Sequence, residues 1–255
     1  MQAVVELTVA MGKRLIAQAV AQMPEVREAL TEGMVVIGRG ITNTYVAEEI
    51  LETEIGKGEY VAGRTLPPGI PWEKLGGNSF ADIVIKDGEL VAGVTTIEAA
   101  KSMKKGDVYL KGGNALNYAR QQVGILVGHP EGGTIGGVYG TLISRKVHLI
   151  IPIGLEKLVS DDIEALSRLS RDVDTHPQHP VLSLFPITGT IVTEIEALRI
   201  LCDVHAHLLS AGGVAGAEGA IWLLLEGEIE ELDNAIALCD SLKDEPAVVL
   251  EYLGD

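Results

Sequence analysis

Apolar positions in the first two thirds of the chain form helical stripes and short strands in turn. Ile16, Val20 and Met23 recur at the spacing of one helical face, which predicts a helix over residues 7–23, and Pro24 can open a second short helix. Four short apolar runs further along are typical of buried strands: residues 34–37, 108–110, 123–127 and 147–151.

Glycine-rich loops follow several of these predicted strands. Residues 38–44 read GRGITNT and lead into a helical run, and residues 128–140 form a second glycine loop before a further helix. Asp87-Gly88 predicts the turn of a hairpin between two apolar segments. Short strands that alternate with helices, with glycines just past the strand ends, are how an open α/β sheet presents backbone N–H groups to an anion. We therefore predict a Rossmann-like α/β domain over residues 1–178.

The pattern changes near residue 181, where strands and helices follow the order β-α-β-β-α-β. Thr193 and Glu196 form a capping box ahead of one helical stripe, and a second stripe precedes the apolar segment 247–253. That order is typical of a ferredoxin-like α+β domain, which we predict over residues 179–255. Its glycine-rich connection, residues 210–219, either turns the chain or covers a ligand.

Composition narrows the class of protein. Asp and Glu total 36 against 20 Lys and Arg, a formal net charge of -16, and we find no local basic patch. Such a surface repels nucleic acid and anionic lipid, so we predict neither as a partner. The start of the chain does not resemble a secretion signal, and the longest apolar run is far short of the roughly 20 residues that span a bilayer. The two cysteines, Cys202 and Cys239, fit a reducing compartment, and we predict a cytoplasmic protein.

Other polar segments carry weaker signals. The loop over residues 56–79 is rich in Gly and Pro, and its Arg64 could hold a phosphate or a carboxylate, or could simply be solvated. His176 and His179 are flanked by prolines and lack a third ligand nearby, so we interpret their segment as a linker and predict no metal site and no cofactor. The aliphatic, glycine-rich composition is compatible with a homo-oligomer.

The best candidate for a ligand site is the loop after the first predicted strand of the α/β region. Thr42, Asn43 and Thr44 stand where a helix should begin, and each can either cap the helix or bind an anion. Gly38 and Gly40 let another group approach the backbone, which favours ligand contact.

The order of these features resembles a known superfamily. The resemblance is carried by an N-terminal helix, by the segment VVIGRGITNTYVAEEIL, and by KGGNAL followed by a glycine loop, a helix, a strand and GLEKLV. These features are similar to the superfamily of ribose-phosphate isomerases, glucosamine-phosphate deaminases, CoA transferases and methylthioribose-phosphate isomerases. The similarity covers roughly residues 10–160. In that superfamily the first glycine loop binds phosphate. The resemblance implies this role for residues 38–44, and a substrate-binding role for Gly112, Gly113 and Asn114, which match a GAD sequence with a functional aspartate.

The chain also departs from that superfamily. Asn114 replaces the aspartate, and an amide cannot act as a general base. In an alternative register Lys111 begins the isomerase KGG motif and contacts substrate, but the glutamate expected later in that motif is missing. Both alignments keep a binding loop and lose the carboxylate. The remaining catalytic candidates are Glu131 and His129 in the second glycine loop, or an acid from another part of the fold, with Glu131 as the nucleophile in the case of a CoA transferase.

Three hypotheses follow for the function. The first is a protein that binds a small anion, such as a sugar phosphate, through Thr42, Asn43, Thr44, Lys111 and Asn114, with isomerase-like proton transfer if it is an enzyme. The second is a regulatory protein that senses a ligand without turnover, which loss of the carboxylate would suit. The third is CoA transfer through Glu131. Resemblance of fold alone does not decide among them.

Overall fold

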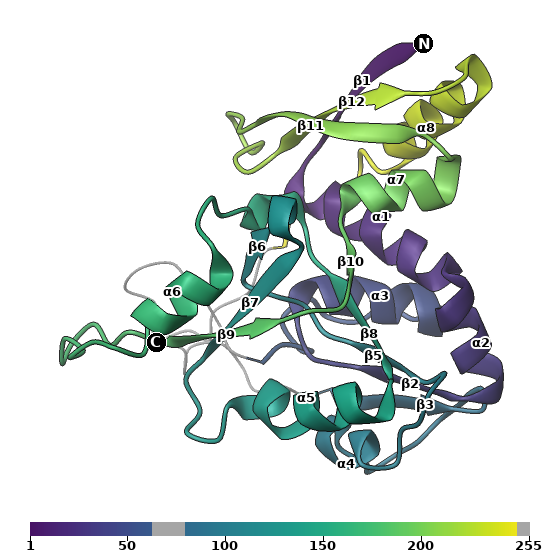
Figure 1. The fold of residues 1–255 in the computed structure, drawn as a ribbon. Helices are drawn as coiled ribbons and strands as arrows, with labels where there is room; N and C mark the ends of the chain where they lie inside the picture. The colour runs from purple at the N-terminus through teal and green to yellow at the C-terminus, as the bar shows by residue number, and fades with distance from the viewer. Residues whose placement is uncertain (63–79, 249–255) are drawn as a thin grey trace, which may run out of the picture.

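The computed structural model describes residues 1–62 and 80–248, which form a mixed α/β fold with eight α-helices and three β-sheets (Figure 1). The predicted role of Arg64 and most of the predicted strand at 247–253 fall outside the described residues. Within the described part of the chain, no helix is both long enough and apolar enough to cross a membrane.

A mixed six-stranded sheet is the centre of the fold. Its first four strands run parallel and its last two pair antiparallel at one edge. The two central strands are short and buried along their whole length, as expected of strands covered on both faces. In spatial order the strands are β10 (Thr190–Val192), β8 (His148–Pro152), β5 (Val108–Leu110), β2 (Met34–Ile37), β3 (Ile83–Lys86) and β4 (Glu89–Leu90).

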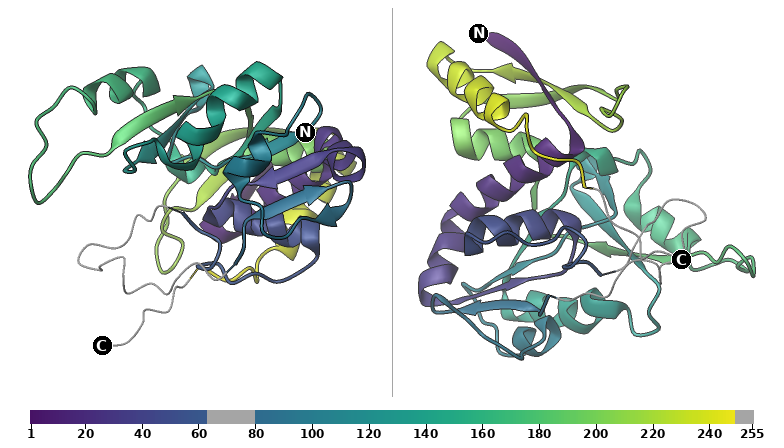
Figure 2. Two further views of the ribbon diagram at one scale, coloured as in Figure 1. Left: turned by 90° about the horizontal axis from the view of Figure 1, so that it is seen from below. Right: turned by 180° about the vertical axis from the view of Figure 1, so that it is seen from behind.

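Helices cover both faces of this sheet (Figures 1 and 2). One face carries α1 (Val9–Gln22), α2 (Pro24–Glu32) and α3 (Ile41–Leu51), and the other carries α4 (Thr96–Ala100) and α5 (Gly133–Arg145). The helix predicted over residues 7–23, the helix opened by Pro24, and the strand at 34–37 are all confirmed. The predicted hairpin is also confirmed, with Asp87 and Gly88 both at positive φ in its turn.

A second, antiparallel sheet lies beside the first. It contains β6 (Ala115–Asn117), β7 (Gln122–Val127) and β9 (Ser183–Ile187), and α6 (Ile163–Leu169) packs on it. The short 3-10 helix η2 (Tyr118–Arg120) joins β6 to β7. The side chain of Asp162 caps α6 by accepting the N–H of Ala165.

The third sheet joins an N-terminal strand to two strands from the C-terminal part of the chain. Its strand order is β1 (Gln2–Leu7), β12 (Ile221–Glu226) and β11 (His205–Ala211), all antiparallel, and α7 (Glu194–Cys202) and α8 (Ile229–Ser241) pack on it. The predicted capping box of Thr193 and Glu196 is present at the start of α7. Helix α1 packs against both α3 and α7, so it connects this sheet to the central one.

The pairing of the third sheet differs from the predicted ferredoxin-like order. The strand that we expected to begin that domain is β9, and it pairs with β7 instead. The physical reason is local packing: Leu184 of β9 occupies the space over Gly124 of β7, where a Cβ atom would lie only 2.7 Å from the leucine side chain. The vacant edge of β12 pairs with β1, a strand that the sequence analysis did not identify.

The core is largely aliphatic, with a few tyrosines. Tyr60 is fully buried, and its hydroxyl donates to the carbonyl of Ile37 and accepts the N–H of Ile83. It therefore fixes the end of β2 against the start of β3, next to the loop that leads into α3.

Candidate functional site

The carboxyl ends of β2, β5 and β8 open onto a cavity of about 840 Å3. Loops past the carboxyl ends of parallel strands are where α/β folds bind their ligands, and this volume suits a small organic molecule. We call the residues from these loops, from the start of α3 and from α1 the cavity floor: Lys13, Thr42, Asn43, Lys111, Glu156 and Lys157.

The N-terminus of α3 faces the cavity without a side-chain cap. Gly40 occupies the N-cap position, and no hydrogen bond within the described residues occupies the first amide groups of the helix, at Ile41, Thr42 and Asn43. The hydroxyl of Thr42 and the carbonyl oxygen of Asn43 are buried and have no hydrogen-bond partner among the described residues. Free N–H groups, a positive helix end and an unpaired hydroxyl together form a site that suits an anion.

Asn43 also has a structural role. Its amide nitrogen donates to the carbonyl of Gly38 at 2.6 Å and to that of Leu110 at 3.2 Å. These contacts join the ends of β2 and β5, while the amide oxygen remains unpaired beside the cavity within the described part of the chain. One side chain thus holds the loop in place and presents a polar atom to a ligand.

Lys111 follows β5 directly and reaches the cavity floor. Its N–H donates to the carbonyl of Ile150, and its side chain passes close to Gly38, where a Cβ atom would lie 3.1 Å from the lysine Cδ. Among the described residues its ammonium group has no hydrogen bond or ion pair. Burial, together with repulsion from Lys157, lowers the pKa of Lys111 to about 8.

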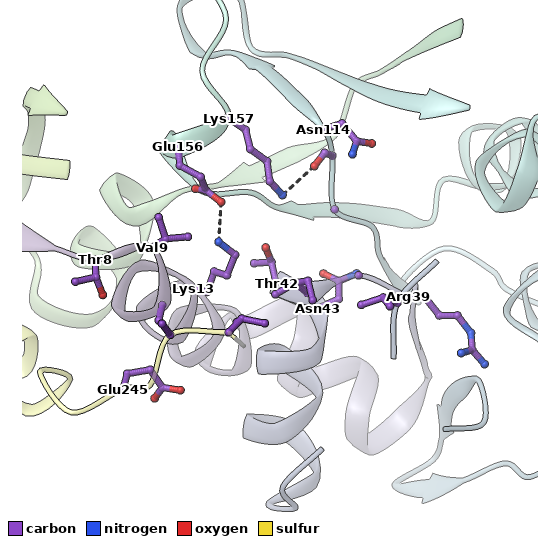
Figure 3. A pocket seen from close by; sticks show the side chains of 18 of the residues that line it. Thr8, Val9, Lys13, Arg39, Thr42, Asn43, Asn114, Glu156, Lys157 and Glu245 are labelled. Carbon is purple, nitrogen blue, oxygen red and sulfur yellow. Dashed lines mark hydrogen bonds and ion pairs between the residues drawn. The ribbon is translucent and has the colours of Figure 1, made fainter. Parts of the chain in front are cut away.

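The remaining charges of the floor come from α1 and from η3 (Leu155–Lys157), which follows β8. Lys13 donates to Glu156 at 2.7 Å, and Lys157 donates to the carbonyl of Gly113 at 3.0 Å. Figure 3 shows Lys13, Lys157 and Glu156 converging above Thr42. Burial works to raise the pKa of Glu156, but the ammonium groups of Lys13 and Lys157 outweigh it and lower that pKa. Burial lowers the pKa of Lys157.

A second carboxyl group lies behind the floor, on Glu194 at the start of α7. It is only 3% exposed, and its Oε2 accepts the N–H of Leu155 at 2.9 Å. Burial and the nearby charge of Glu156 raise the pKa of Glu194 to about 7. Gly12 of α1 makes room for it, since a Cβ atom there would lie 2.5 Å from Oε1 of Glu194.

The outer wall of the cavity comes from distant parts of the chain. Gly216 and Glu218, from the connection between β11 and β12, line the cavity. The glycine-rich segment 210–219 therefore both turns the chain and borders the cavity. Glu245 lies beyond α8 and is held by Arg14 at 2.9 Å, and Arg14 also pairs with two glutamates of α3. Apolar side chains complete the lining and suit the organic part of a ligand: Val9, Ala10, Ile41, Val61, Ala247 and Val248.

The structure brings together most of the residues predicted to bind a ligand. Gly38 and Thr44 are the exceptions: Gly38 supports Lys111, and the Thr44 hydroxyl donates to the carbonyl of Gly40 within the helix. Asn114 lines the cavity, although its side-chain oxygen accepts the N–H of Leu126. The predicted residues in the cavity lining are Gly40, Thr42, Asn43, Lys111, Gly112, Gly113 and Asn114.

The two predicted catalytic candidates lie elsewhere. His129 and Glu131 occupy an exposed turn before α5, where the ring nitrogen of His129 accepts the N–H of Glu131 at 3.2 Å. Neither is among the residues that line the cavity.

Sequence reasoning missed four charged residues of this region: Lys13, Glu156, Lys157 and Glu194. For Glu156 and Lys157 a signal was present, since they follow the strand at 147–151 in the position where ligand-binding residues of α/β sheets occur. Lys13 and Glu194 sit in helices that converge only in the folded chain. The described residues contain no cluster of three His, Cys, Asp or Glu side chains that could hold a metal ion.

Comparison with known proteins identifies no relative: no protein-family model, curated protein or solved structure matches this chain.

Proposed function

We propose that this chain binds a small organic anion, with a phosphate or carboxylate group at the N-terminus of α3 and the organic part in the rest of the cavity. The observation that carries this proposal is that three lysines, Lys13, Lys111 and Lys157, line the floor beside an uncapped helix N-terminus, with Glu156 as the one carboxylate of the floor. A phosphorylated sugar is the ligand class that fits both this charge and the cavity volume best.

The charge of the floor is unusual for this protein. The chain has 16 more acidic than basic residues, yet three lysines line the floor with one acid, and among the described residues only Lys13 forms an ion pair with that acid. Repulsion from Lys157 helps to lower the pKa of Lys111, so the free protein is destabilised by holding these charges together. A bound anion would remove that cost, and functional sites are where such perturbed groups gather.

If the protein is an enzyme, its reaction is isomerase-like proton transfer next to a carbonyl group. Glu156 is the carboxylate of the floor and is deprotonated at neutral pH, since the two ammonium groups lower its pKa. It replaces Glu131 and His129 as the candidate general base because it lies within the cavity. The parallel strands with loops at their carboxyl ends support a Rossmann-like interpretation and the proposed likeness to the sugar-phosphate isomerase superfamily.

Sensing of the same anion without turnover is the second candidate. It is favoured by the engagement of Glu156 with Lys13 at 2.7 Å, because a carboxylate held in an ion pair is a weaker base. Incubation with ribose 5-phosphate and analysis of the products would separate the two, since an isomerase interconverts aldose and ketose whereas a sensor returns the ligand unchanged.

The binding proposal is tested by calorimetric titration of the protein with inorganic phosphate, ribose 5-phosphate and coenzyme A. Lys111→Met should weaken binding of the phosphate compounds at least about tenfold, because a charge-assisted hydrogen bond is worth about 1.5–3 kcal/mol. The same change should leave the melting temperature unchanged or raised, since it removes like-charge repulsion. The control is Lys105→Met, at an exposed lysine, which should bind as the wild type does. Equal affinity in the two variants would overturn the assignment of the site.

A further inference from the structure

We propose that Lys111 is a nucleophile that forms an imine with the carbonyl group of an aldehyde or ketone carrying a phosphate or carboxylate. This inference rests on the proposed function, since the anionic group of the substrate is held by the same cavity floor. It adds the class of the reacting group, a carbonyl compound, and a covalent step.

The position of Lys111 is fixed by its backbone and by the base of its side chain. It begins one residue past β5, its N–H donates to the carbonyl of Ile150 at 3.0 Å, and its methylene groups pack over Gly38. The amine therefore extends into the cavity from a rigid strand end, where a reacting group can be held precisely enough for catalysis.

Lys111 differs from the two other lysines of the floor. Lys13 is paired with Glu156, and Lys157 donates to the carbonyl of Gly113. Among the described residues no acceptor engages the amine of Lys111, so its lone pair is available once the proton has left. Lys157 and Lys13 can hold the anionic group while Lys111 reacts.

The surroundings also favour the neutral amine. Burial and the charge of Lys157 bring the pKa of Lys111 to about 8. At neutral pH such a lysine has much more neutral amine than one of ordinary pKa, and desolvation beside another cation is a recognised way to activate an amine nucleophile.

The reaction balances without an additional co-reactant. The neutral amine attacks the carbonyl carbon, a C–N bond forms, and a proton moves from nitrogen to oxygen to give a carbinolamine. The oxygen then leaves as water after taking up a second proton, and a protonated imine remains. The iminium makes the neighbouring C–H bond more acidic, and Glu156 is the carboxylate of the floor that can accept this proton.

The test is reductive trapping on the full-length protein. The protein is incubated with glyceraldehyde 3-phosphate and sodium cyanoborohydride, which transfers hydride to the iminium carbon and leaves a stable secondary amine. Mass spectrometry of the intact protein and of its peptides then locates the adduct. We expect Lys111 to be modified at least tenfold faster than the exposed Lys105, and inorganic phosphate to slow the modification of Lys111 alone. Glyceraldehyde, which lacks the phosphate, should modify Lys111 more slowly.

Two separate readings of the wild type distinguish this inference from the proposed function: calorimetry with inorganic phosphate reports binding, and the adduct reports the imine. Lys111→Arg keeps the positive charge but cannot form an imine, so it should lose the rapid adduct. If the wild type binds phosphate but modifies Lys111 no faster than Lys105, or modifies Lys157 instead, the imine proposal is wrong and the binding proposal stands. If the wild type neither binds phosphate nor forms the adduct, both are wrong.

Discussion

At the scale of single residues, the cavity floor contains two buried polar atoms without a partner in the described part of the chain, and the hydroxyls of Tyr45 and Tyr109 are further such atoms outside the cavity lining. The Thr42 hydroxyl and the Asn43 oxygen are buried at the start of α3 without a partner among the described residues, although a buried polar group normally finds one. Each such group costs about 1–3 kcal/mol in the free protein. That cost is offset when a ligand supplies the missing hydrogen bond, which is why these two atoms support a binding site.

Thr42→Val tests this interpretation directly. Valine has nearly the same shape but no hydroxyl, so phosphate affinity should fall by roughly three- to tenfold, the value of one neutral hydrogen bond. The free energy of unfolding without ligand should stay the same or rise, because an unsatisfied buried group is removed. Calorimetry and urea unfolding measure the two quantities. A loss of stability without a loss of affinity would show that the hydroxyl is structural.

Glu194 gives a prediction about pH. Its pKa of about 7 lies above the ordinary value of 4.5, so between these pH values the folded protein holds a proton that the unfolded chain has released. The resulting stability is fully present below pH 4.5 and is lost as pH rises through 7, an amount of about 3 kcal/mol for a fully buried group.

Glu194→Gln mimics the protonated side chain and should remove this dependence. We expect the stability of the wild type relative to the variant, measured by urea unfolding, to fall by about 3 kcal/mol between pH 4.5 and pH 8. Glu164→Gln, at a helical glutamate outside the cavity lining, is the control and should show no such trend. Parallel pH profiles of the wild type and Glu194→Gln would mean that Glu194 is already ionised in the acidic range.

At the scale of elements, local rules predicted much of the fold. The strand at 34–37, the helix that Pro24 opens, the Asp87-Gly88 turn and the capping box of Thr193 each depend on neighbours within a few residues, and each is present. Partners of strands were harder to predict, because pairing depends on side chains far apart in sequence. The contact of Leu184 with Gly124 places β9 beside β7, and no periodicity within β9 encodes that contact.

Two glycines in helices should respond to alanine in opposite ways. Gly12 of α1 faces Glu194, so Gly12→Ala should destabilise the protein by about 1–3 kcal/mol through overpacking, although alanine favours a helix. At Gly140 of α5 a Cβ atom would meet no described atom within 4 Å, so Gly140→Ala should stabilise by about 0.5–1 kcal/mol. Thermal unfolding of the two variants measures both effects. Stabilisation by Gly12→Ala would contradict the close packing of α1 against Glu194.

At the scale of the whole molecule, the cavity depends on contacts that sequence order does not reveal. The loop after β2 and its polar residues could be predicted, because a strand, glycines and a helix follow one another there. Lys13 and Glu245 could not, since they come from distant parts of the chain and line one cavity only in the folded protein. The sequence therefore predicted the cavity residues of the loop after β2 and missed those that come from α1 and from the segment beyond α8.

Arg14 is the residue that links these parts. It pairs with Glu48 and Glu49 of α3 at 2.7 and 2.9 Å and with Glu245 beyond α8 at 2.9 Å, and its side chain is 15% exposed. Within the described part of the chain, Arg14→Met would leave Glu49 and Glu245 without the cation that pairs with them and Glu48 with Lys57 alone. We expect a loss of about 3–5 kcal/mol in the free energy of unfolding, as when one partner of a buried ion pair is removed.

The same variant should also weaken anion binding, even though Arg14 does not line the cavity. Release of Glu245 frees the segment that forms the outer wall and adds unpaired negative charge near the floor, and both effects oppose an anionic ligand. Calorimetry with ribose 5-phosphate measures this effect at a temperature where the variant is still folded. Arg199→Met, at an exposed arginine of α7, is the matched control and should change neither stability nor affinity. Unchanged affinity in Arg14→Met would show that the floor binds its ligand without help from the C-terminal segment.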